Sequence, residues 1–157
     1  KVKMNFLIIT PTYNENANIS TLISKIREIE TEITLDVLII DDASPDGTAL
    51  TIKKIMSNDN GLYLIERERK DGLASAYCEG FKWAIKNNYD YVIQMDADLS
   101  HSPKDILKFI DNLGKQNYIK QASLSSMKLP GKSKSGITMK GFRVFVLIDP
   151  TGKSERG

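Results

Sequence analysis

The chain has 157 residues, of which 41% are hydrophobic and 27% charged, the balance of a globular protein long enough to bury one sizeable core. Its 22 basic and 20 acidic side chains leave a formal net charge of +2, which is too even to indicate a nucleic-acid partner. The single cysteine, Cys78, excludes an internal disulfide framework and permits a reducing compartment, and the single histidine, His101, excludes a histidine-rich zinc site.

Short apolar runs alternate with patterns of helical spacing along most of the chain. The runs predict buried strands at Asn5–Thr10, Leu35–Ile40, Leu62–Ile65 and Tyr91–Met95. Apolar residues three and four positions apart predict helices at Ala17–Glu30, Ala49–Ser57, Gly72–Asn87 and Pro103–Leu113. We expect Thr48 and Ser102 to act as N-caps, and Leu73 and Ile85 to lie on the buried side of the third helix. The alternation predicts an α/β fold with an open, mostly parallel sheet and helices on both faces.

Two aspartates follow the fourth predicted strand. Asp96 and Asp98 are separated by one small residue, so their side chains point the same way if the strand geometry continues. Both carboxylates can then converge on a hard divalent cation such as Mg²⁺ or Mn²⁺. The plainer interpretation is a pair of exposed turn aspartates without a ligand, and the spacing alone is a weak signal.

Polar clusters follow three of the predicted strands, at residues 11–15, 41–46 and 96–101. The carboxyl ends of parallel strands share one edge of a sheet, where ligands bind in open α/β folds. Ordinary turn chemistry explains the residue types, but it does not explain the density of acid expected at this edge, which comes from Glu15, Asp41, Asp42, Asp96 and Asp98. A bound cation or ligand hydroxyls would relieve that repulsion. No glycine-rich phosphate loop is present, so a metal-held diphosphate fits better than an ordinary nucleotide site.

Four motifs in register resemble the family 2 glycosyltransferases, and within them the dolichol- or polyprenol-phosphate mannosyltransferases. They are Pro11-Thr-Tyr-Asn-Glu15, Asp41-Asp42-x-Ser44-Pro-Asp-Gly-Thr48, Lys70-x-Gly-Leu73 with Ala76-Tyr77 and Gly80, and Met95-Asp-Ala-Asp-Leu-Ser-His101. The resemblance covers residues 5 to about 114. It implies a GT-A fold, a GDP-mannose donor, a dolichyl or polyprenyl phosphate acceptor, and transfer with inversion.

The resemblance also implies roles for individual residues. The metal is expected on Asp96 and Asp98, which would serve catalysis as metal anchors and not as proton carriers. Ser100 stands where some relatives have a glutamine ligand. The acceptor phosphate is already anionic near neutral pH, because its second pKa is about 6, so it needs no strong base. The expected donor contacts are Pro11, Tyr13, Glu15, Ile40, Asp42, Asp96, Ala97 and Asp98.

The chain departs from the family in several places. Ala43 and Ala74 replace common glycines, which is tolerable if neither needs a positive φ. We divide the chain into a nucleotide-sugar-binding core at residues 1–114 and a shortened or rearranged part at residues 115–157. That second part reads as loop and one strand, at Phe142–Ile148. Arg67, Arg69 and Lys70 are equally well explained as phosphate contacts or as a solvated face.

A lipid-linked acceptor implies work at a membrane. No apolar run approaches the ~20 residues of a spanning helix, and no signal peptide is visible. We therefore expect a peripheral protein on the cytoplasmic face of a membrane. It would contact the membrane through a surface patch or through a separate anchoring subunit or domain. Six of the lysines in the last part would add attraction to anionic lipid; they are Lys115, Lys120, Lys128, Lys132, Lys134 and Lys140.

Three alternatives stay open. One is another family 2 transferase, for example one that moves glucose to a lipid phosphate. A second is a remnant that binds the donor without transferring the sugar. The third is a receiver domain of the response-regulator type, which Asp41-Asp42 suggests; the Asp96-Ala-Asp98 motif does not fit that class.

Overall fold

The computed structural model describes residues 5–29, 34–100, 102–108, 110, 135–139 and 142–146. The strands are β1 (Asn5–Thr12), β2 (Thr34–Asp41), β3 (Leu62–Glu66), β4 (Tyr91–Gln94), β5 (Ser135–Met139) and β6 (Phe142–Val146). The helices are α1 (Ile19–Arg27), α2 (Thr48–Met56) and α3 (Leu73–Lys86), and residues 105–108 and 110 are also helical. The four predicted strands and the first three predicted helices are confirmed, with ends that move by a few residues.

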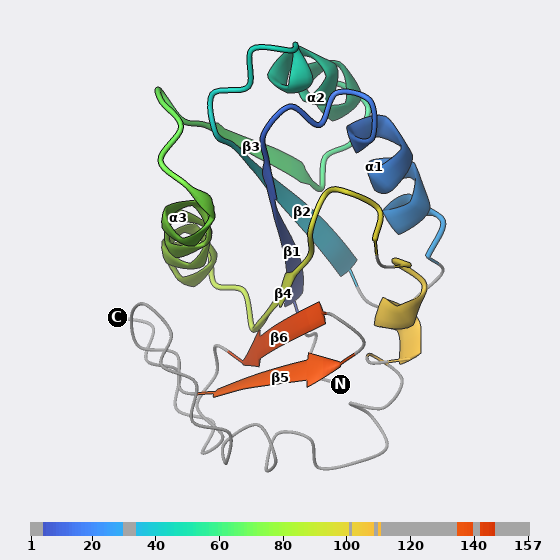
Figure 1. The fold of residues 1–157 in the computed structure, drawn as a ribbon. Coiled ribbons are helices and arrows are strands. Elements are labelled where there is room, and N and C mark those ends of the chain that lie inside the picture. Colours follow the sequence, from blue (N-terminus) through green and yellow to red (C-terminus); the bar gives the residue numbers. More distant parts are fainter. Residues whose placement is uncertain are drawn as a thin grey trace.

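These strands form one six-stranded sheet in the order β3-β2-β1-β4-β6-β5 (Figure 1). Strands β1 to β4 pair in parallel, whereas β6 pairs antiparallel with both β4 and β5. The sheet is therefore mostly parallel, as predicted. The expectation of a single strand after residue 114 is wrong, because two strands are present there. Sequence periodicity did not reveal the first of them, since its SGITM sequence includes a glycine and two hydroxyl side chains.

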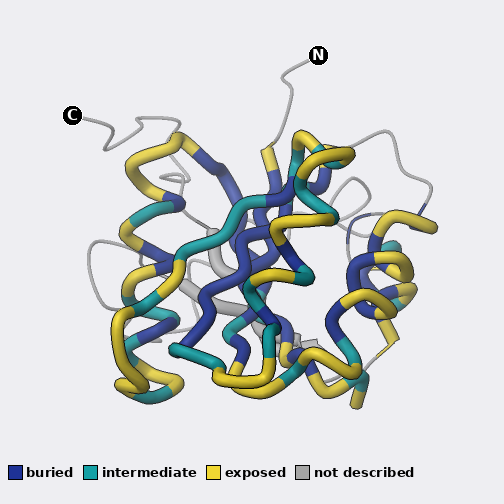
Figure 2. The backbone as a smooth tube through the Cα atoms, turned by 90° about the horizontal axis from the view of Figure 1, so that it is seen from above, coloured by how far each residue is buried: buried dark blue, intermediate teal, exposed yellow. Residues whose placement is uncertain are grey.

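Helices cover both faces of the sheet, and each face has its own core. Alternate residues of β1 point to opposite faces: Phe6 and Ile8 pack with α1 and α2, and Leu7 and Ile9 pack with α3. Helix α1 presents a stripe at helical spacing to its core, made of Ile19, Leu22, Ile23 and Ile26. Viewed from above, buried residues run through the central strands and exposed ones mark the outer turns of the helices (Figure 2).

The order in which successive strands join the sheet reverses at β1. From β1 the chain moves to β2 and β3 through α1 and α2, then returns through α3 on the opposite face to place β4 on the other side of β1. Such a switch point leaves a crevice at the carboxyl ends of the two strands, where ligands bind in this class of fold. The fold thus directs attention to the residues that follow β1 and β4.

Several local expectations need correction. Leu73 and Ile85 were expected on the buried side of α3, yet they are 58% and 38% exposed. The N-cap of α2 is Gly47, with φ of 88°, and not Thr48. Ala43 has φ of 60°, so it occupies a conformation that suits the glycine it replaces. Ser102 lies in a hydrogen-bonded turn, its carbonyl accepting the N–H of Asp105 at 3.1 Å, before the helical residues begin.

Candidate functional site

A cavity of about 360 Å³ opens at the carboxyl edge of the sheet. Its walls are formed by the end of β1, by the segments that follow β1, β2 and β4, and by the start of α3 with the residues just before it. It therefore lies at the switch point that the topology defines. The lining residues are Pro11, Thr12, Tyr13, Glu15, Asp42, Lys70, Gly72, Leu73, Ala76, Asp96, Ala97 and Asp98.

The two aspartates after β4 reach this cavity with their carboxylates exposed, while Ala97 between them is buried. Asp96 accepts a hydrogen bond from the hydroxyl of Tyr77 at 3.3 Å, which links it to α3. Asp98 accepts the backbone N–H of Ser100 at 3.0 Å. Both carboxylates keep further acceptor capacity, because an ionised carboxylate has about four lone-pair sites. The pair can therefore accept ligand donors or bind a cation.

Loop residues 14–16 are fastened to the segment 44–48. The backbone N–H of Asn14 donates to Ser44 Oγ at 2.9 Å, and that of Asn16 donates to Asp46 Oδ2 at 3.0 Å. Glu15 is held between them, since its N–H donates to Thr48 Oγ1 at 3.2 Å. The Thr48 hydroxyl in turn donates to Asp46, and this bond is the main cause that lowers the pKa of Asp46 below 3.8. The Ser-Pro-Asp-Gly-Thr motif thus supports the pocket loop from behind.

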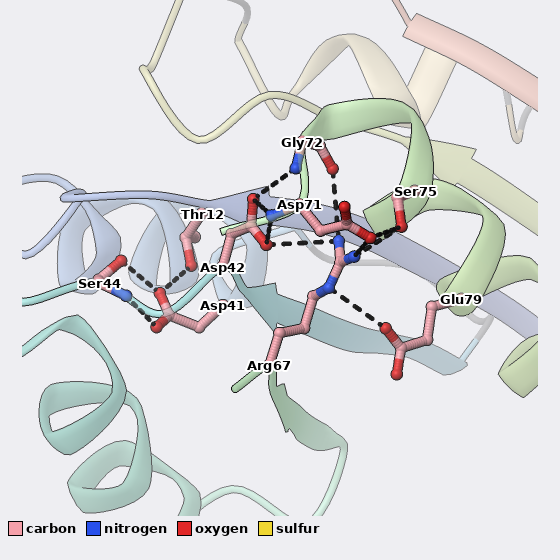
Figure 3. Close-up of polar contacts among 9 residues, drawn as sticks. All are labelled: Thr12, Asp41, Asp42, Ser44, Arg67, Asp71, Gly72, Ser75 and Glu79. Carbon is pink, nitrogen blue, oxygen red and sulfur yellow. Dashed lines mark hydrogen bonds and ion pairs between the residues drawn. The ribbon is translucent and has the colours of Figure 1, made fainter. Parts of the chain in front are cut away.

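Asp41 is turned away from the cavity. Its carboxylate accepts hydrogen bonds from Thr12 Oγ1 and Ser44 Oγ, each at 2.7 Å, and from the Ser44 N–H at 3.0 Å (Figure 3). The residue is 2% exposed and does not line the pocket. Our expectation that Asp41 crowds the ligand edge is wrong, because neighbouring residues of an extended chain point in opposite directions.

Asp42 lines the cavity and also holds the turn before α3. It accepts the backbone N–H groups of Asp71 and Gly72, both at 3.0 Å. The guanidinium of Arg67 lies 3.4 Å from the same carboxylate, and the two side chains are 9% and 7% exposed. Arg67 further contacts the carboxylate of Asp71, the carbonyl of Gly72, the hydroxyl of Ser75 and the carboxylate of Glu79 (Figure 3).

The largely buried guanidinium of Arg67 therefore joins the end of β3 to α3 and supports the turn at residues 71–72. Its partners in the described part of the chain are mainly carboxylates, and it does not line the pocket. A phosphate role for Arg67, which the sequence left as an even choice, has no support in this arrangement. Lys70 differs, since it lines the pocket and its ammonium lies 3.7 Å from the centre of the Tyr13 ring.

Most of the residues expected to contact a donor come together here. Pro11, Tyr13, Glu15 and Asp42 line the cavity with Asp96, Ala97 and Asp98. Ile40 does not; its side chain is fully buried beneath α3. His101 and the six lysines proposed to attract anionic lipid, from Lys115 to Lys140, lie outside the described residues. Sequence reasoning did not assign Thr12, Gly72, Leu73 and Ala76 to the site, although all four stand within the quoted motifs.

Backbone strain gathers in the same loops. Asn14, Ala43 and Leu99 have φ values of 55°, 60° and 63°, a region that non-glycine residues rarely occupy. Each follows a different strand, at the edge where the cavity opens. Such conformations cost of order 1–3 kcal/mol and persist at sites where the surrounding structure imposes them.

Comparison with known proteins gives this site a context. A model described as glycosyl transferase family 2 matches residues 7–134. An undecaprenyl-phosphate mannosyltransferase from Micrococcus luteus is 34% identical over 128 residues, which cover 82% of this chain and 50% of that protein. A polyprenol monophosphomannose synthase from Mycolicibacterium smegmatis is 34% identical over 106 residues, 67% of this chain and 39% of that protein. The chain thus spans at most about half the length of these relatives.

Solved structures share the fold. A mannosyltransferase from Pyrobaculum calidifontis, in complex with GDP-Man and Mn²⁺, matches with a TM-score of 0.61 and 23% identity over 94% of this chain and 46% of that one. Staphylococcus aureus TarS matches with a TM-score of 0.56 and 27% identity over 69% of this chain and 20% of that one. These likenesses confirm the expected open sheet of the GT-A type. The family model matches most of the chain, and the two relatives described above are each 34% identical to it. The chain therefore belongs to glycosyl transferase family 2.

Proposed function

We propose that the chain carries the donor site of an inverting transferase that moves mannose from GDP-mannose to a polyprenyl or dolichyl phosphate. One observation carries the proposal: Asp96 and Asp98 present exposed carboxylates in a cavity at the switch point of the sheet. Family membership supports glycosyl transfer, and the names of the two relatives support mannose and a polyprenyl phosphate.

The carboxylate pair fits a divalent cation that shares its ligands with a substrate. In the part of the chain that the structure describes, no group of three or more His, Cys, Asp or Glu side chains could hold a metal ion. A Mg²⁺ site of this class uses one or two carboxylates and completes its shell with phosphates and water. Asp96 and Asp98 would hold the cation, which when bound stabilises negative charge on a departing diphosphate.

The remaining work falls to the chain's own side chains. Tyr77 donates a hydrogen bond to Asp96 from α3 and so favours one orientation of that carboxylate before a ligand arrives. Glu15 is positioned by its backbone bond to Thr48, and Asp42 by the turn it holds. Carboxylates of this kind accept hydrogen bonds from ribose hydroxyls or base N–H groups. Ile40 stays a proposed donor contact only through its main chain, because its side chain is buried.

We propose a peripheral location on the cytoplasmic face of a membrane, with a separate anchoring subunit or domain as a partner. This proposal is based on the polyprenyl lipid that appears in the names of both relatives. Among the described residues, no helix is both long and apolar enough to cross a bilayer. Flotation with liposomes that carry anionic lipid and polyprenyl phosphate tests this, and failure to associate at low salt contradicts it.

A transfer assay tests the function. The protein is incubated with radiolabelled GDP-mannose, polyprenyl phosphate and Mg²⁺ or Mn²⁺, and label is counted in the organic phase. We expect label there only with a divalent cation. Transfer from UDP-glucose but not from GDP-mannose would replace mannose by glucose. Donor binding without transfer would support a donor-binding remnant, and no binding of any nucleotide sugar would refute the proposal.

A further inference from the structure

Three cations stand before α3, and the structure separates their roles. The side chain of Arg67 is only 9% exposed, contacts three carboxylates and does not line the pocket. Arg69 is exposed and does not line it either. Lys70 is the only cationic residue among the described residues that line the cavity. The three are close in sequence, yet one of them alone faces the site.

Among the described residues no carboxylate forms an ion pair with the ammonium of Lys70, although four acidic residues line the same cavity. In the described part of the chain the ion pairs involve Arg27, Lys53, Arg67 and Lys108, and none involves Lys70. The ammonium instead lies 3.7 Å from the centre of the Tyr13 ring. A cation–π contact at an exposed site contributes about 0.5–1 kcal/mol, less than a hydrogen bond between two charged groups. An arriving anion can therefore displace the ring.

The backbone that carries Lys70 is fixed. The two residues that follow it donate their N–H groups to the carboxylate of Asp42 at 3.0 Å. That carboxylate is held in turn by Arg67. The side chain of Lys70 is exposed and long, so it can swing while its Cα stays in place. This combination, a rigid base and a free charged head, suits the capture of an anion at the mouth of a pocket.

We propose that Lys70 binds a phosphate oxyanion of a substrate in this cavity, and that Tyr13 holds its ammonium until that anion arrives. The inference rests on the proposed function for the identity of the substrate. Two sources share the chemistry: the diphosphate of a nucleotide-sugar donor and the monophosphate of a lipid acceptor. Both need a cation in a cavity that is otherwise lined by acidic and neutral side chains.

Calorimetric titration with Mn²⁺ present separates the sources. The probes are GDP for the donor, geranyl phosphate for the acceptor, and inorganic diphosphate. The proteins are the parent, Lys70→Met, which keeps the length and removes the charge, Lys70→Arg, which keeps the charge, and Arg69→Met as a matched control beside the pocket. An unchanged melting temperature checks that each variant folds.

We expect Lys70→Met to bind at least one probe roughly tenfold more weakly than the parent. Lys70→Arg should stay close to the parent, Arg69→Met should equal it, and the difference should shrink at high salt. Loss for GDP and diphosphate alone assigns Lys70 to the donor; loss for geranyl phosphate alone assigns it to the acceptor. Parent-like binding of all three probes by Lys70→Met, or Lys70→Arg as weak as Lys70→Met, overturns the inference. A parent that binds none of the probes refutes the proposed function as well.

Discussion

Replacing Arg67 by methionine should be among the most damaging changes near the site. The variant keeps the apolar stem and removes a guanidinium that contacts Asp42 at 3.4 Å, Asp71 at 3.0 Å and Ser75 at 2.6 Å. Hydrogen bonds to charged groups contribute about 1.5–3 kcal/mol, and removing one partner of a buried ion pair costs about 3–5 kcal/mol. Asp71 and Glu79 are 56% and 46% exposed, so their share is small.

We therefore expect Arg67→Met to lower the free energy of unfolding by about 2–4 kcal/mol. Lys53→Met is the matched control, because Lys53 forms an ion pair of 2.7 Å with Glu66 in which the two side chains are 52% and 47% exposed. It should cost less than about 1 kcal/mol. Arg67→Lys should lie between the two, since an ammonium cannot reproduce the planar fork.

Denaturant unfolding followed through Trp83 measures these differences. Trp83 is the only tryptophan and stacks on Tyr89 from α3, with ring centres 5.8 Å apart, so its fluorescence reports on the element that Arg67 anchors. Equal losses of unfolding free energy in Arg67→Met and Lys53→Met would show that the guanidinium of Arg67 stabilises the fold no more than a surface ion pair does. That result would refute the reasoning.

Two further changes test the core beneath the site. The hydroxyl of Tyr91 is buried without a hydrogen-bond partner among the described residues, so Tyr91→Phe should raise stability by about 1 kcal/mol in denaturant unfolding near neutral pH. Burial also raises the pKa of Tyr91 above 10.0, so the folded protein keeps the phenol proton at a pH where the unfolded chain loses it. The free energy of unfolding of the parent should therefore fall as pH rises past about 10, and it should fall less steeply in Tyr91→Phe. Gly80→Ala would place a Cβ 2.7 Å from Ile40 and 2.8 Å from Ile9, so despite the better helix propensity of alanine we expect a lower melting temperature. An unchanged or higher melting temperature would mean that α3 moves away from the sheet at little cost.

The order of strands and helices could be predicted from the sequence because its apolar residues recur at clear strand and helix spacings. Strands such as Asn5–Thr12 and helices such as Ile19–Arg27 bury continuous faces, and strand–helix alternation dictates a parallel sheet. The convergence of the loops at one edge follows from that topology, which is why most of the expected donor contacts line one cavity.

Features that depend on the direction of individual side chains could not be predicted from the sequence. Asp41 and Asp42 are equally acidic, yet one turns to Thr12 and Ser44 while the other faces the cavity. Leu73 has the spacing of a buried helix residue, but it lies in the first turn of α3, where it is exposed and lines the cavity. Two carboxylate partners of Arg67 are distant in sequence, Asp42 just after β2 and Glu79 in α3, and no local pattern reveals such contacts.

The dependence of GDP binding on a divalent cation tests the central claim most directly. Asp98→Asn keeps the oxygen that accepts the Ser100 N–H and removes the charge, so the fold should be unaffected. Calorimetric titration of GDP, with and without Mn²⁺, should show cation-dependent binding in the parent and a loss of roughly tenfold or more in Asp98→Asn. Binding that ignores the cation, or equal cation-dependent affinity in the two proteins, would contradict the assignment of Asp96 and Asp98 as the anchors of a metal-held nucleoside diphosphate.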